Sequence, residues 1–219
     1  MNRMVIFDCD GTLVDGQAAI CDTMDEAFAA ASLPAPDRNS VRRMVGLSLP
    51  RALEILAPDA SEQQREAALD AYRAGYRSRR ETSLLEEPLY EGMAALIERL
   101  ATAGWLLGVA TGKSDRGLHA CLDTHGIKER FVTLQTADRH PSKPHPAMLE
   151  EALSEAGVTA ENALMIGDTT FDMDMARAAG VRAIGVAWGY HEPHELLEAG
   201  AIGVAETMEE LEKLIHGRA

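Results

Sequence analysis

The sequence predicts an α/β fold, with a Rossmann-like core built on a parallel sheet and an inserted helical domain. Two observations predict it: short apolar runs alternate with segments of helical periodicity, and one long alanine-rich stretch contains no convincing strand. Parallel strands need a crossover connection, which a helix usually supplies, so this alternation is typical of a parallel sheet. The clearest apolar runs are residues 4–7, 106–110, 163–166 and 183–187.

Two weaker apolar segments, residues 131–134 and 202–205, would bring the sheet to about five or six strands, which is near the usual size. Three of the clear runs lead into polar residues: Asp8, Thr111 and Asp168. Ligands of parallel sheets bind beyond the carboxyl ends of the strands. The sequence therefore predicts a binding site at that edge, with side chains from three strand ends.

The alanine-rich stretch defines the domain organisation. Residues 15–86 are the predicted helical insertion, and residues 1–14 and 87–219 form the predicted core. Turn-prone dipeptides, Asp15-Gly16 and Glu87-Pro88, flank the insertion and are the predicted hinges. The insertion contains no lysine and no histidine. Its helical patterns lie around residues 20–31, 41–45, 51–56 and 62–77.

Composition indicates a soluble globular protein with a full core, since 46% of its 219 residues are apolar. The formal net charge of −14 repels nucleic acid and anionic membranes, so neither is expected as a partner. No stretch approaches the roughly 18 apolar residues of a membrane span, and Asp8 interrupts the first apolar run too early for a signal peptide. We therefore expect a cytoplasmic protein. The three cysteines show no CxxC spacing, which favours reduced thiols over disulfides or a zinc ribbon.

The segment Asp8-Cys9-Asp10-Gly11-Thr12 follows the first apolar run and carries two carboxylates beside a turn glycine and a hydroxyl. Side chains alternate along extended chain, so Asp8 and Asp10 are predicted to point the same way and Cys9 away from them. Two like charges this close raise the pKa of one carboxyl group unless a cation neutralises them. Mg²⁺ suits carboxylates combined with phosphate oxygens, and a solvated Asp-Gly turn is the mundane alternative.

The segment Thr111-Gly112-Lys113-Ser114 closes the second clear run. It resembles a phosphate-holding corner, where glycine lets backbone amides approach an anion at the start of a helix. It is not a Walker P-loop, because that pattern needs four residues between its glycines and only three separate Gly108 from Gly112. The alternative is a simple helix cap, in which Ser114 accepts from the first-turn amides.

Two later segments add further charged candidates. Lys143 lies in a proline-stiffened stretch, where a fixed ammonium can act as a point charge beside phosphate; a solvated loop lysine is the alternative. Asp168 and Asp172 lie where a predicted strand passes into a helix, and the helix dipole alone would favour an acid there. Four acids converging on one sheet edge would nevertheless be costly without a cation, which favours a metal site.

Arginines of the insertion are candidates for contacting an anionic substrate. Arg42, Arg43 and Arg51 flank the segment Gly46-Leu47-Ser48, and we take Arg43 as a substrate-binding residue, with a solvated helix face as the alternative. Zinc is not indicated, because the candidate ligands lack paired spacing and flanking acids: His119, Cys121 and His125.

Taken in order, the segments resemble the four motifs of the haloacid dehalogenase superfamily: Asp8-x-Asp10-Gly11-Thr12, Thr111-Gly112, Lys143-Pro144 and Gly167-Asp168-x-x-x-Asp172. The resemblance covers the whole chain, because the helical insertion occupies the position of that superfamily's cap, directly after the first motif. The first motif and the Val-Gly-Leu-Ser segment of the insertion look closest to phosphoglycolate-phosphatase-like members. One departure is Gly16, where many relatives carry serine.

The resemblance implies a phosphatase that hydrolyses a small phosphorylated metabolite, a phosphoglycolate-like phosphomonoester, through an aspartyl-phosphate. In that scheme Asp8 attacks phosphorus, while Asp10 protonates the leaving alcohol and later activates water. The implied cofactor is Mg²⁺, held by Asp8, the backbone carbonyl of Asp10, Asp168 and, directly or through water, Asp172. The implied phosphate- and substrate-binding residues are Gly11, Thr12, Thr111, Gly112 and Lys143, of which Thr111 and Lys143 bind the transferring phosphoryl group.

Other members of the superfamily fit less well. A Schiff-base phosphonate hydrolase needs a cap lysine and a sugar-phosphate mutase a cap histidine, and residues 15–86 contain neither. Haloacid dehalogenases lack the second acid of the first motif, which is present here as Asp10. Pyrophosphate, a sugar phosphate and a nucleotide monophosphate stay open as substrates. A phospho-aspartate signalling protein or a binding protein without turnover is the non-enzymatic alternative, and a monomer is favoured.

Overall fold

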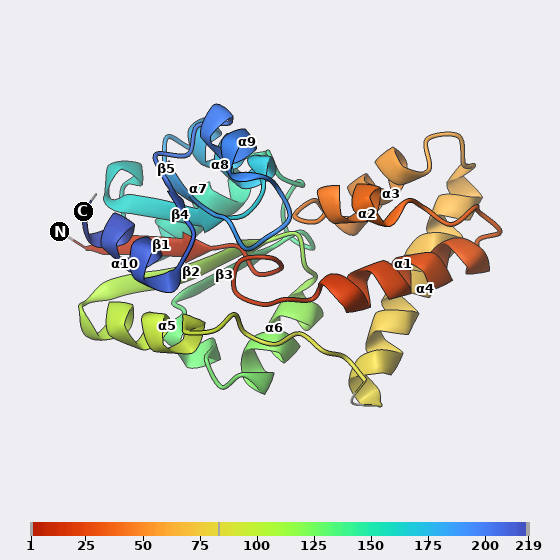
Figure 1. Cartoon of the computed structure of the whole chain (residues 1–219), viewed down its shortest axis with the longest axis horizontal. Coiled ribbons are helices and arrows are strands. Elements are labelled where there is room, and N and C mark those ends of the chain that lie inside the picture. The colour runs from red at the N-terminus through yellow and green to blue at the C-terminus, as the bar shows by residue number, and fades with distance from the viewer. Residues whose placement is uncertain (1, 83, 218–219) are drawn as a thin grey trace.

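The computed structural model describes residues 2–82 and 84–217 and confirms the predicted α/β class (Figure 1). Its strands form one six-stranded parallel sheet in the order β3-β2-β1-β4-β5-β6. The strands are β1 (Arg3–Phe7), β2 (Trp105–Thr111), β3 (Thr133–Thr136), β4 (Ala163–Gly167), β5 (Arg182–Val186) and β6 (Val204–Ala205). Because β1 pairs with both β2 and β4, the carboxyl ends of these three strands are neighbours.

Helices cover both faces of the sheet. Apolar residues of α5, α6 and α10 pack on one face, and those of α7, α8 and α9 pack on the other. The α-helices of the core are α5 (Met93–Thr102), α6 (Asp115–Thr124), α7 (Ala147–Ala156), α8 (Thr170–Ala178), α9 (Pro193–Glu198) and α10 (Met208–Gly217). The short 3₁₀ helices are η1 (Lys128–Arg130) and η2 (Ala160–Asn162).

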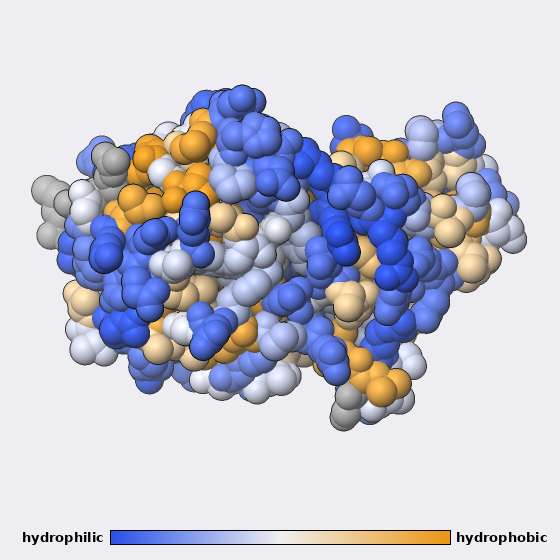
Figure 2. All heavy atoms as spheres, in the orientation of Figure 1, coloured by the Kyte–Doolittle hydropathy of each residue, from blue (hydrophilic) through white to orange (hydrophobic). Residues whose placement is uncertain are grey.

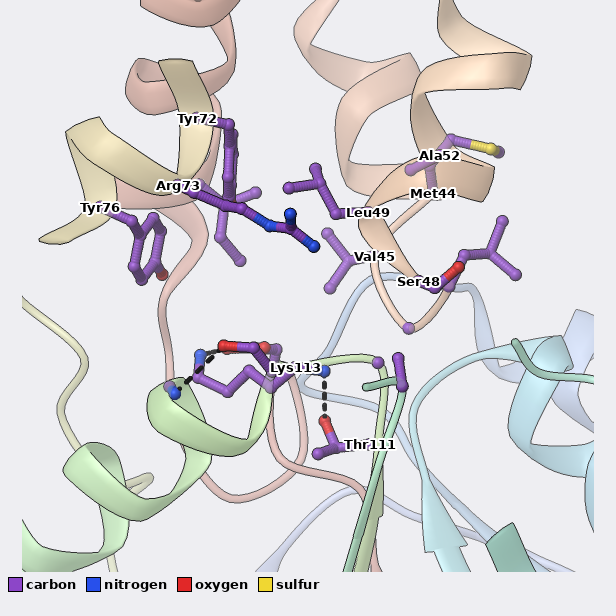
Figure 3. Close-up of a pocket in the computed structure, with 18 of the residues that line it drawn as sticks. Met44, Val45, Ser48, Leu49, Ala52, Tyr72, Arg73, Tyr76, Thr111 and Lys113 are labelled. Carbon is purple, nitrogen blue, oxygen red and sulfur yellow. Dashed lines mark hydrogen bonds and ion pairs between the residues drawn. The ribbon is translucent and has the colours of Figure 1, made fainter. Parts of the chain in front are cut away.

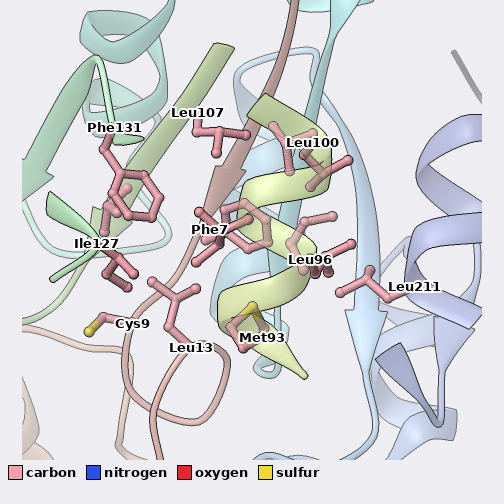
Figure 4. Close-up of a cluster of buried hydrophobic side chains, with 14 of the residues drawn as sticks. Phe7, Cys9, Leu13, Met93, Leu96, Leu100, Leu107, Ile127, Phe131 and Leu211 are labelled. Atoms are coloured by element: carbon pink, nitrogen blue, oxygen red, sulfur yellow. The ribbon is translucent and has the colours of Figure 1, made fainter. Parts of the chain in front are cut away.

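Burial on both faces explains why β1 is apolar throughout instead of alternating with polar residues. Val5 and Phe7 belong to the apolar cluster beneath α5, whereas Met4 and Ile6 belong to the cluster beneath α7 and α8. Figure 4 shows Phe7 lying beside Leu96 of α5. The strand therefore anchors the residues that follow it, which are the first motif of the sequence.

The four clear apolar runs are all strands, and each end lies within about one residue of its predicted position. The weaker segments differ more. The segment predicted at 131–134 is shifted to Thr133–Thr136, and the one predicted at 202–205 contracts to two residues. Strand β3 is polar but buried, because Thr133 and Gln135 both hydrogen-bond the carboxylate of Glu155. A hydrophobic pattern does not detect such a strand.

A second helical unit stands to one side of the sheet, beyond the carboxyl ends of the strands (Figure 1). It has its own apolar cluster, which includes Met24, Phe28 and Leu53. We propose that residues 15–86 make up this unit, which we call the cap, with the bounds expected from the sequence. The backbone N–H of Asp15 donates to the carbonyl of Pro88 at 2.9 Å, so the two chain connections run side by side. The helices of the cap are α1 (Gln17–Ala30), α2 (Arg38–Arg43), α3 (Leu49–Leu56) and α4 (Glu62–Glu81).

The surface shown in Figure 2 is mostly hydrophilic, with apolar residues in smaller groups. None of the described helices has the length and apolar character that crossing a bilayer requires. The three cysteines are buried and free: Cys9, Cys21 and Cys121. Cys9 belongs to the apolar core beneath α5, so it does point away from the edge at which its neighbours Asp8 and Asp10 lie.

Candidate active site

Three buried carboxylates meet at the carboxyl edge of the sheet. Asp8 follows β1, Asp168 follows β4, and Asp172 lies in the first turn of α8. Oxygen atoms from the three groups lie within 4.8 Å of one another. Parallel strand order brings them together, because β1 and β4 are adjacent and end at the same edge. The resemblance implied that Asp10 binds the metal through its backbone carbonyl, and its carboxylate lies outside this group and pairs with Lys113.

Lys143 is the buried cation of this acidic cluster. Its Nζ lies 2.9 Å from Asp8 Oδ2 and 2.6 Å from Asp172 Oδ1, and its side chain is 0% exposed. Burial acts to lower the pKa of Lys143, but the two carboxylates outweigh it and the pKa is raised. Lys143 is therefore a fixed charge at the strand ends and not a solvated loop lysine.

One lysine does not balance three carboxylates. Burial raises the pKa of Asp8 to about 7 against the attraction of Lys143, and the charge of Asp172 adds to the rise. Burial and the neighbouring carboxylates also raise the pKa of Asp168. Asp8 Oδ2 is buried and accepts no hydrogen bond from any described residue, although Lys143 lies close to it. Excess negative charge and an oxygen with spare acceptor capacity fit a divalent cation that prefers oxygen ligands.

Asp168 is held rigidly by the first motif and by the loop after β5. The hydroxyl of Thr12 donates to Asp168 Oδ1 at 2.7 Å, and the backbone N–H of Tyr190 donates to Asp168 Oδ2 at 2.9 Å. Gly11 has φ +83, and a Cβ there would lie 2.2 Å from Asp168 Oδ2. Glycine is therefore required at position 11 for both its conformation and its space. The Thr12 side chain, predicted to bind phosphate or substrate, orients this carboxylate.

Asp172 serves the helix and the cluster together. Its Oδ2 accepts from the backbone N–H and the hydroxyl of Thr169, at 3.1 Å and 2.7 Å, which caps α8. Its Oδ1 accepts from Lys143. Asp172 therefore does stabilise the start of the helix, as its position in the sequence suggested. It does so through Oδ2 alone, and Oδ1 faces the acidic cluster.

A second charged cluster, not predicted from the sequence, lies beside the first. Lys113 Nζ donates to Asp10 Oδ1 at 2.5 Å and to Glu87 Oε1 at 2.6 Å, and the hydroxyl of Tyr76 donates to the same Glu87 oxygen at 3.0 Å. Burial raises the pKa of Asp10 despite Lys113. Because Tyr76 comes from α4, this network joins the cap to the core. The only sequence signal was a lysine directly after Thr111-Gly112.

The second motif lines the same edge. Thr111 is buried, and its hydroxyl accepts from the backbone N–H of Lys113 at 3.2 Å. Ser114 accepts from the N–H of Gly117 at 3.2 Å, so the predicted helix cap is present at the start of α6. Gly112 lies against the cap, and a Cβ there would be 2.4 Å from the carbonyl oxygen of Leu47. The corner and the cap are thus in direct contact.

A cavity of about 500 Å³ opens between the cap and the strand ends (Figure 3). Asp8, Asp10 and Thr111 line its core side. Residues from all four cap helices line the opposite side. Four of the predicted site residues, Asp8, Asp10, Thr111 and Gly112, therefore line one cavity, in which a phosphorylated molecule would meet carboxylates, a hydroxyl and cap side chains at once.

Arg43, predicted to bind substrate, is placed differently. Its guanidinium donates two hydrogen bonds to Glu195 of α9, at 2.6 Å and 2.8 Å, and Arg43 is not among the residues that line the cavity. Its carbonyl accepts from His191 Nε2 at 3.1 Å, while His191 Nδ1 accepts from the N–H of Thr170. Burial lowers the pKa of His191, consistent with a neutral ring in this bridge. Arg43 thus fastens the cap to the core.

Comparison with known proteins gives the same assignment as the four motifs. The family model described as haloacid dehalogenase-like hydrolase matches residues 5–186. The chain is 36% identical over 221 residues to the "Probable phosphatase IndB" of Dickeya dadantii, covering 99% of this chain and 94% of that protein. It is 34% identical over 212 residues to the phosphoglycolate phosphatase of Rhodospirillum rubrum, covering 92% and 87%.

A solved structure of similar shape supports the match. The crystal structure of a predicted phosphatase from Clostridium acetobutylicum superposes with a TM-score of 0.89 and 26% identity, covering 99% of both chains. These similarities extend over the cap as well as the core, and they confirm the resemblance drawn from the motifs. By the family model and by these relatives, the chain is an enzyme and belongs to the haloacid dehalogenase-like hydrolases.

Proposed function

We propose that the chain is a Mg²⁺-dependent phosphatase that hydrolyses a small phosphomonoester through an aspartyl-phosphate on Asp8. The observation that carries the proposal is the position of Asp8. Its carboxylate lies 2.9 Å from Lys143 and within a buried acidic triad, and it lines a cavity whose opposite side is formed by the cap. Phosphoryl transfer depends chiefly on positioning and charge neutralisation, and this site supplies both.

In the first step a carboxylate oxygen of Asp8 attacks phosphorus, and the bond from phosphorus to the ester oxygen breaks. Lys143 and the hydroxyl of Thr111 hold the phosphoryl oxygens. Asp10 gives its proton to the departing alcohol, and burial, which raises the pKa of Asp10, favours the protonated form needed for this. The products are a free alcohol, a phosphorylated Asp8 and an ionised Asp10.

In the second step Asp10 takes a proton from water, whose oxygen attacks phosphorus. The bond from phosphorus to Asp8 breaks, which releases phosphate and restores both carboxyl groups. Mg²⁺, held by Asp8, Asp168, Asp172 and the carbonyl of Asp10, would supply charge neutralisation for the phosphoryl oxygens. Cap side chains cover the cavity opposite the carboxylates and thereby reduce the access of bulk water to the phosphoryl group.

The substrate class follows from kinship, with a phosphoglycolate-like metabolite first and pyrophosphate, a sugar phosphate or a nucleotide monophosphate as alternatives. Relatives named as phosphatases and as phosphoglycolate phosphatase support this order. We further propose a cytoplasmic monomer that acts on small phosphorylated metabolites. Buried free thiols and the net charge of −14 support the compartment and argue against nucleic-acid or membrane partners.

The test is phosphate release from a panel of phosphomonoesters and pyrophosphate, with Mg²⁺ or with EDTA. Wild type and Asp8→Asn are compared after circular dichroism has shown that both are folded. We expect release that needs the metal and that falls at least about 10³-fold in Asp8→Asn. Unchanged turnover by folded Asp8→Asn would overturn the assignment of Asp8 as nucleophile.

A further inference from the structure

Away from the carboxylates, the cavity has two chemically different walls. One wall is apolar and comes from α1 to α3 and the loop between α2 and α3. It carries no charged side chain among its lining residues. Its apolar members include Ile20, Met24, Val41, Met44, Val45, Leu49, Ala52 and Leu56. A surface of this kind stabilises a bound ligand by removing apolar area from water.

The other wall is cationic and aromatic and comes from α4. Tyr72 and Tyr76 line it together with Arg73, Arg77 and Arg80. The arginines are spaced four and three residues apart, which places them on one side of the helix. Figure 3 shows the guanidinium of Arg73 extending into the cavity.

None of these arginines forms an ion pair within the described residues, although the chain carries 35 acidic residues and the charge of Arg80 contributes to lowering the pKa of Glu87. Arg73 and Arg77 make neither an ion pair nor a hydrogen bond in the part of the chain that the structure describes. Arg80 lies over the ring of Tyr76 at 6.0 Å, and its Nη2 is buried without a hydrogen-bond partner there. An unpartnered buried guanidinium nitrogen beside a cavity indicates that an anion from outside the chain belongs there.

The size of the cavity is informative as well. At about 500 Å³ it falls within the range of roughly 300–1,000 Å³ in which pockets enclose drug-sized ligands. Glycolate adds only two carbons to a phosphate group and would leave the apolar wall uncovered. A larger body is needed to reach both walls while the phosphate lies against Lys143.

We propose that the substrate is a phosphomonoester with an apolar or aromatic body that carries a second anionic group, and that this group pairs with the arginines of α4, Arg73 foremost. The inference rests on the proposed phosphatase function, and it places a larger ester ahead of the phosphoglycolate-like substrate that kinship alone puts first. The phosphate binds at the acidic cluster, the body packs against the apolar wall, and the second anion is held where the unpaired guanidinium groups face the cavity.

The experiment compares four esters of alkyl alcohols: 2-hydroxyethyl phosphate, phosphoglycolate, benzyl phosphate and 4-carboxybenzyl phosphate. These differ in body and in the presence of a carboxylate, one feature at a time. Dissociation constants are measured by calorimetry with Mg²⁺ on Asp8→Asn protein, which keeps the esters intact. Arg73→Gln and Ala52→Leu are each added to this protein, and Arg51→Gln is the matched control, because Arg51 is exposed, pairs with Glu54 and lies outside the cavity lining.

We expect 4-carboxybenzyl phosphate to bind at least about tenfold more tightly than phosphoglycolate. Arg73→Gln should reduce the affinity ratio of 4-carboxybenzyl to benzyl phosphate by about tenfold, because hydrogen bonds to charged groups are the stronger ones, and Arg51→Gln should leave this ratio within about twofold. Ala52→Leu narrows the cavity at its apolar wall. It should therefore weaken the binding of both benzyl esters relative to that of the two small esters.

The proposal would be overturned if phosphoglycolate bound as tightly as 4-carboxybenzyl phosphate. It would also be overturned if Arg73→Gln reduced the affinity for all four esters equally. Turnover of the same esters by the wild type, measured in parallel, separates this result from the proposed function. If the esters bind in the expected order but none releases phosphate, the phosphatase function is contradicted and the anion-binding subsite on α4 is supported. Release without the expected order would contradict the subsite alone.

Discussion

Gly112 of the core lies directly against Leu47 of the cap: a Cβ at position 112 would be 2.4 Å from the Leu47 carbonyl oxygen. The next cap residue, Ser48, donates its backbone N–H to the hydroxyl of Ser142 at 2.8 Å. The cap loop is therefore seated on the core by backbone groups, between the second motif and the segment that carries Lys143. This seating requires that residue 112 have no side chain.

Gly112→Ala should impair closure of the cap. The clash is with backbone, which moves less readily than the end of a side chain, so the loop must shift away from the strand ends. We expect kcat/KM to fall by at least about tenfold, because a shift of the cap loop by up to about 1 Å misplaces the substrate relative to the reacting groups. Gly217→Ala is the matched control, because a Cβ there meets nothing within 4 Å. Wild-type kinetics in Gly112→Ala would show that the contact is dispensable.

Substitutions of Lys113 and Glu87 should have non-additive effects on the free energy of unfolding. Lys113→Met leaves the carboxylates of Asp10 and Glu87 without their shared cation, and their side chains are only 12% and 7% exposed. Removing one partner of a buried pair typically costs about 3 kcal/mol or more in the free energy of unfolding. Urea unfolding of Lys113→Met, Glu87→Gln and the double variant measures the coupling, expected at about 1 kcal/mol or more. Strictly additive effects would contradict the network.

The ion pair between Arg43 and Glu195 should give a pH-dependent contribution to stability. The hydrogen bonds from Arg43 lower the pKa of Glu195 from 4.5 to about 2. A lowered pKa in the folded state means that the stabilisation is fully present above pH 4.5, declines as the pH falls, and is lost near pH 2. At pH 7 we expect Glu195→Gln to reduce the free energy of unfolding by up to about 1 kcal/mol, as is usual for a partly exposed pair.

The check is urea unfolding of wild type and Glu195→Gln at pH 7, 4.5 and 3, in which the difference between them should shrink only below pH 4.5. The control is Glu198→Gln, on the same helix, because Glu198 is exposed and has no ion pair among the described residues. A difference as large at pH 3 as at pH 7 would show that it does not come from the ionised carboxylate of Glu195.

Metal binding should stabilise the fold independently of turnover. At Mg²⁺ well above its dissociation constant we expect the melting temperature to rise by about 5 °C and to return on adding EDTA. Asp168→Asn should abolish the rise, whereas Asp174→Asn should retain it, because Asp174 pairs with Arg177 and lies outside the acidic cluster. An equal rise in both variants would place the ion elsewhere.

The sequence was most informative where burial is complete on both faces. Residues 163–166 were predicted as a strand because every residue is apolar, and β4 occupies Ala163–Gly167. The prediction for the edge strand β3 was displaced by two residues. Its buried polar residues obtain their hydrogen-bond partners from α7 and not from neighbours in the chain. Such partners are a property of the folded chain, so hydrophobic pattern does not reveal them.

At the site, acids placed directly after strands were predictable, since parallel strands deliver their ends to one edge. The partners of Lys113 were not, because Asp10 lies 103 residues earlier in the chain and Glu87 lies 26 residues earlier, directly after the cap. The same limit applies to Arg43, which was predicted to bind substrate. Nothing within the insertion indicates that Glu195, 152 residues later, would accept its guanidinium.

The most direct measurement of the central proposal is the chemical state of Asp8 during turnover. Substrate labelled with radioactive phosphorus, the best ester of the panel, is mixed with the protein and quenched in acid within one turnover. We expect label on the protein that hydroxylamine releases, that maps to the peptide containing Asp8, and that is absent in Asp8→Asn. Label at another residue, or turnover by wild type with no labelled protein at any time, would contradict an aspartyl-phosphate on Asp8.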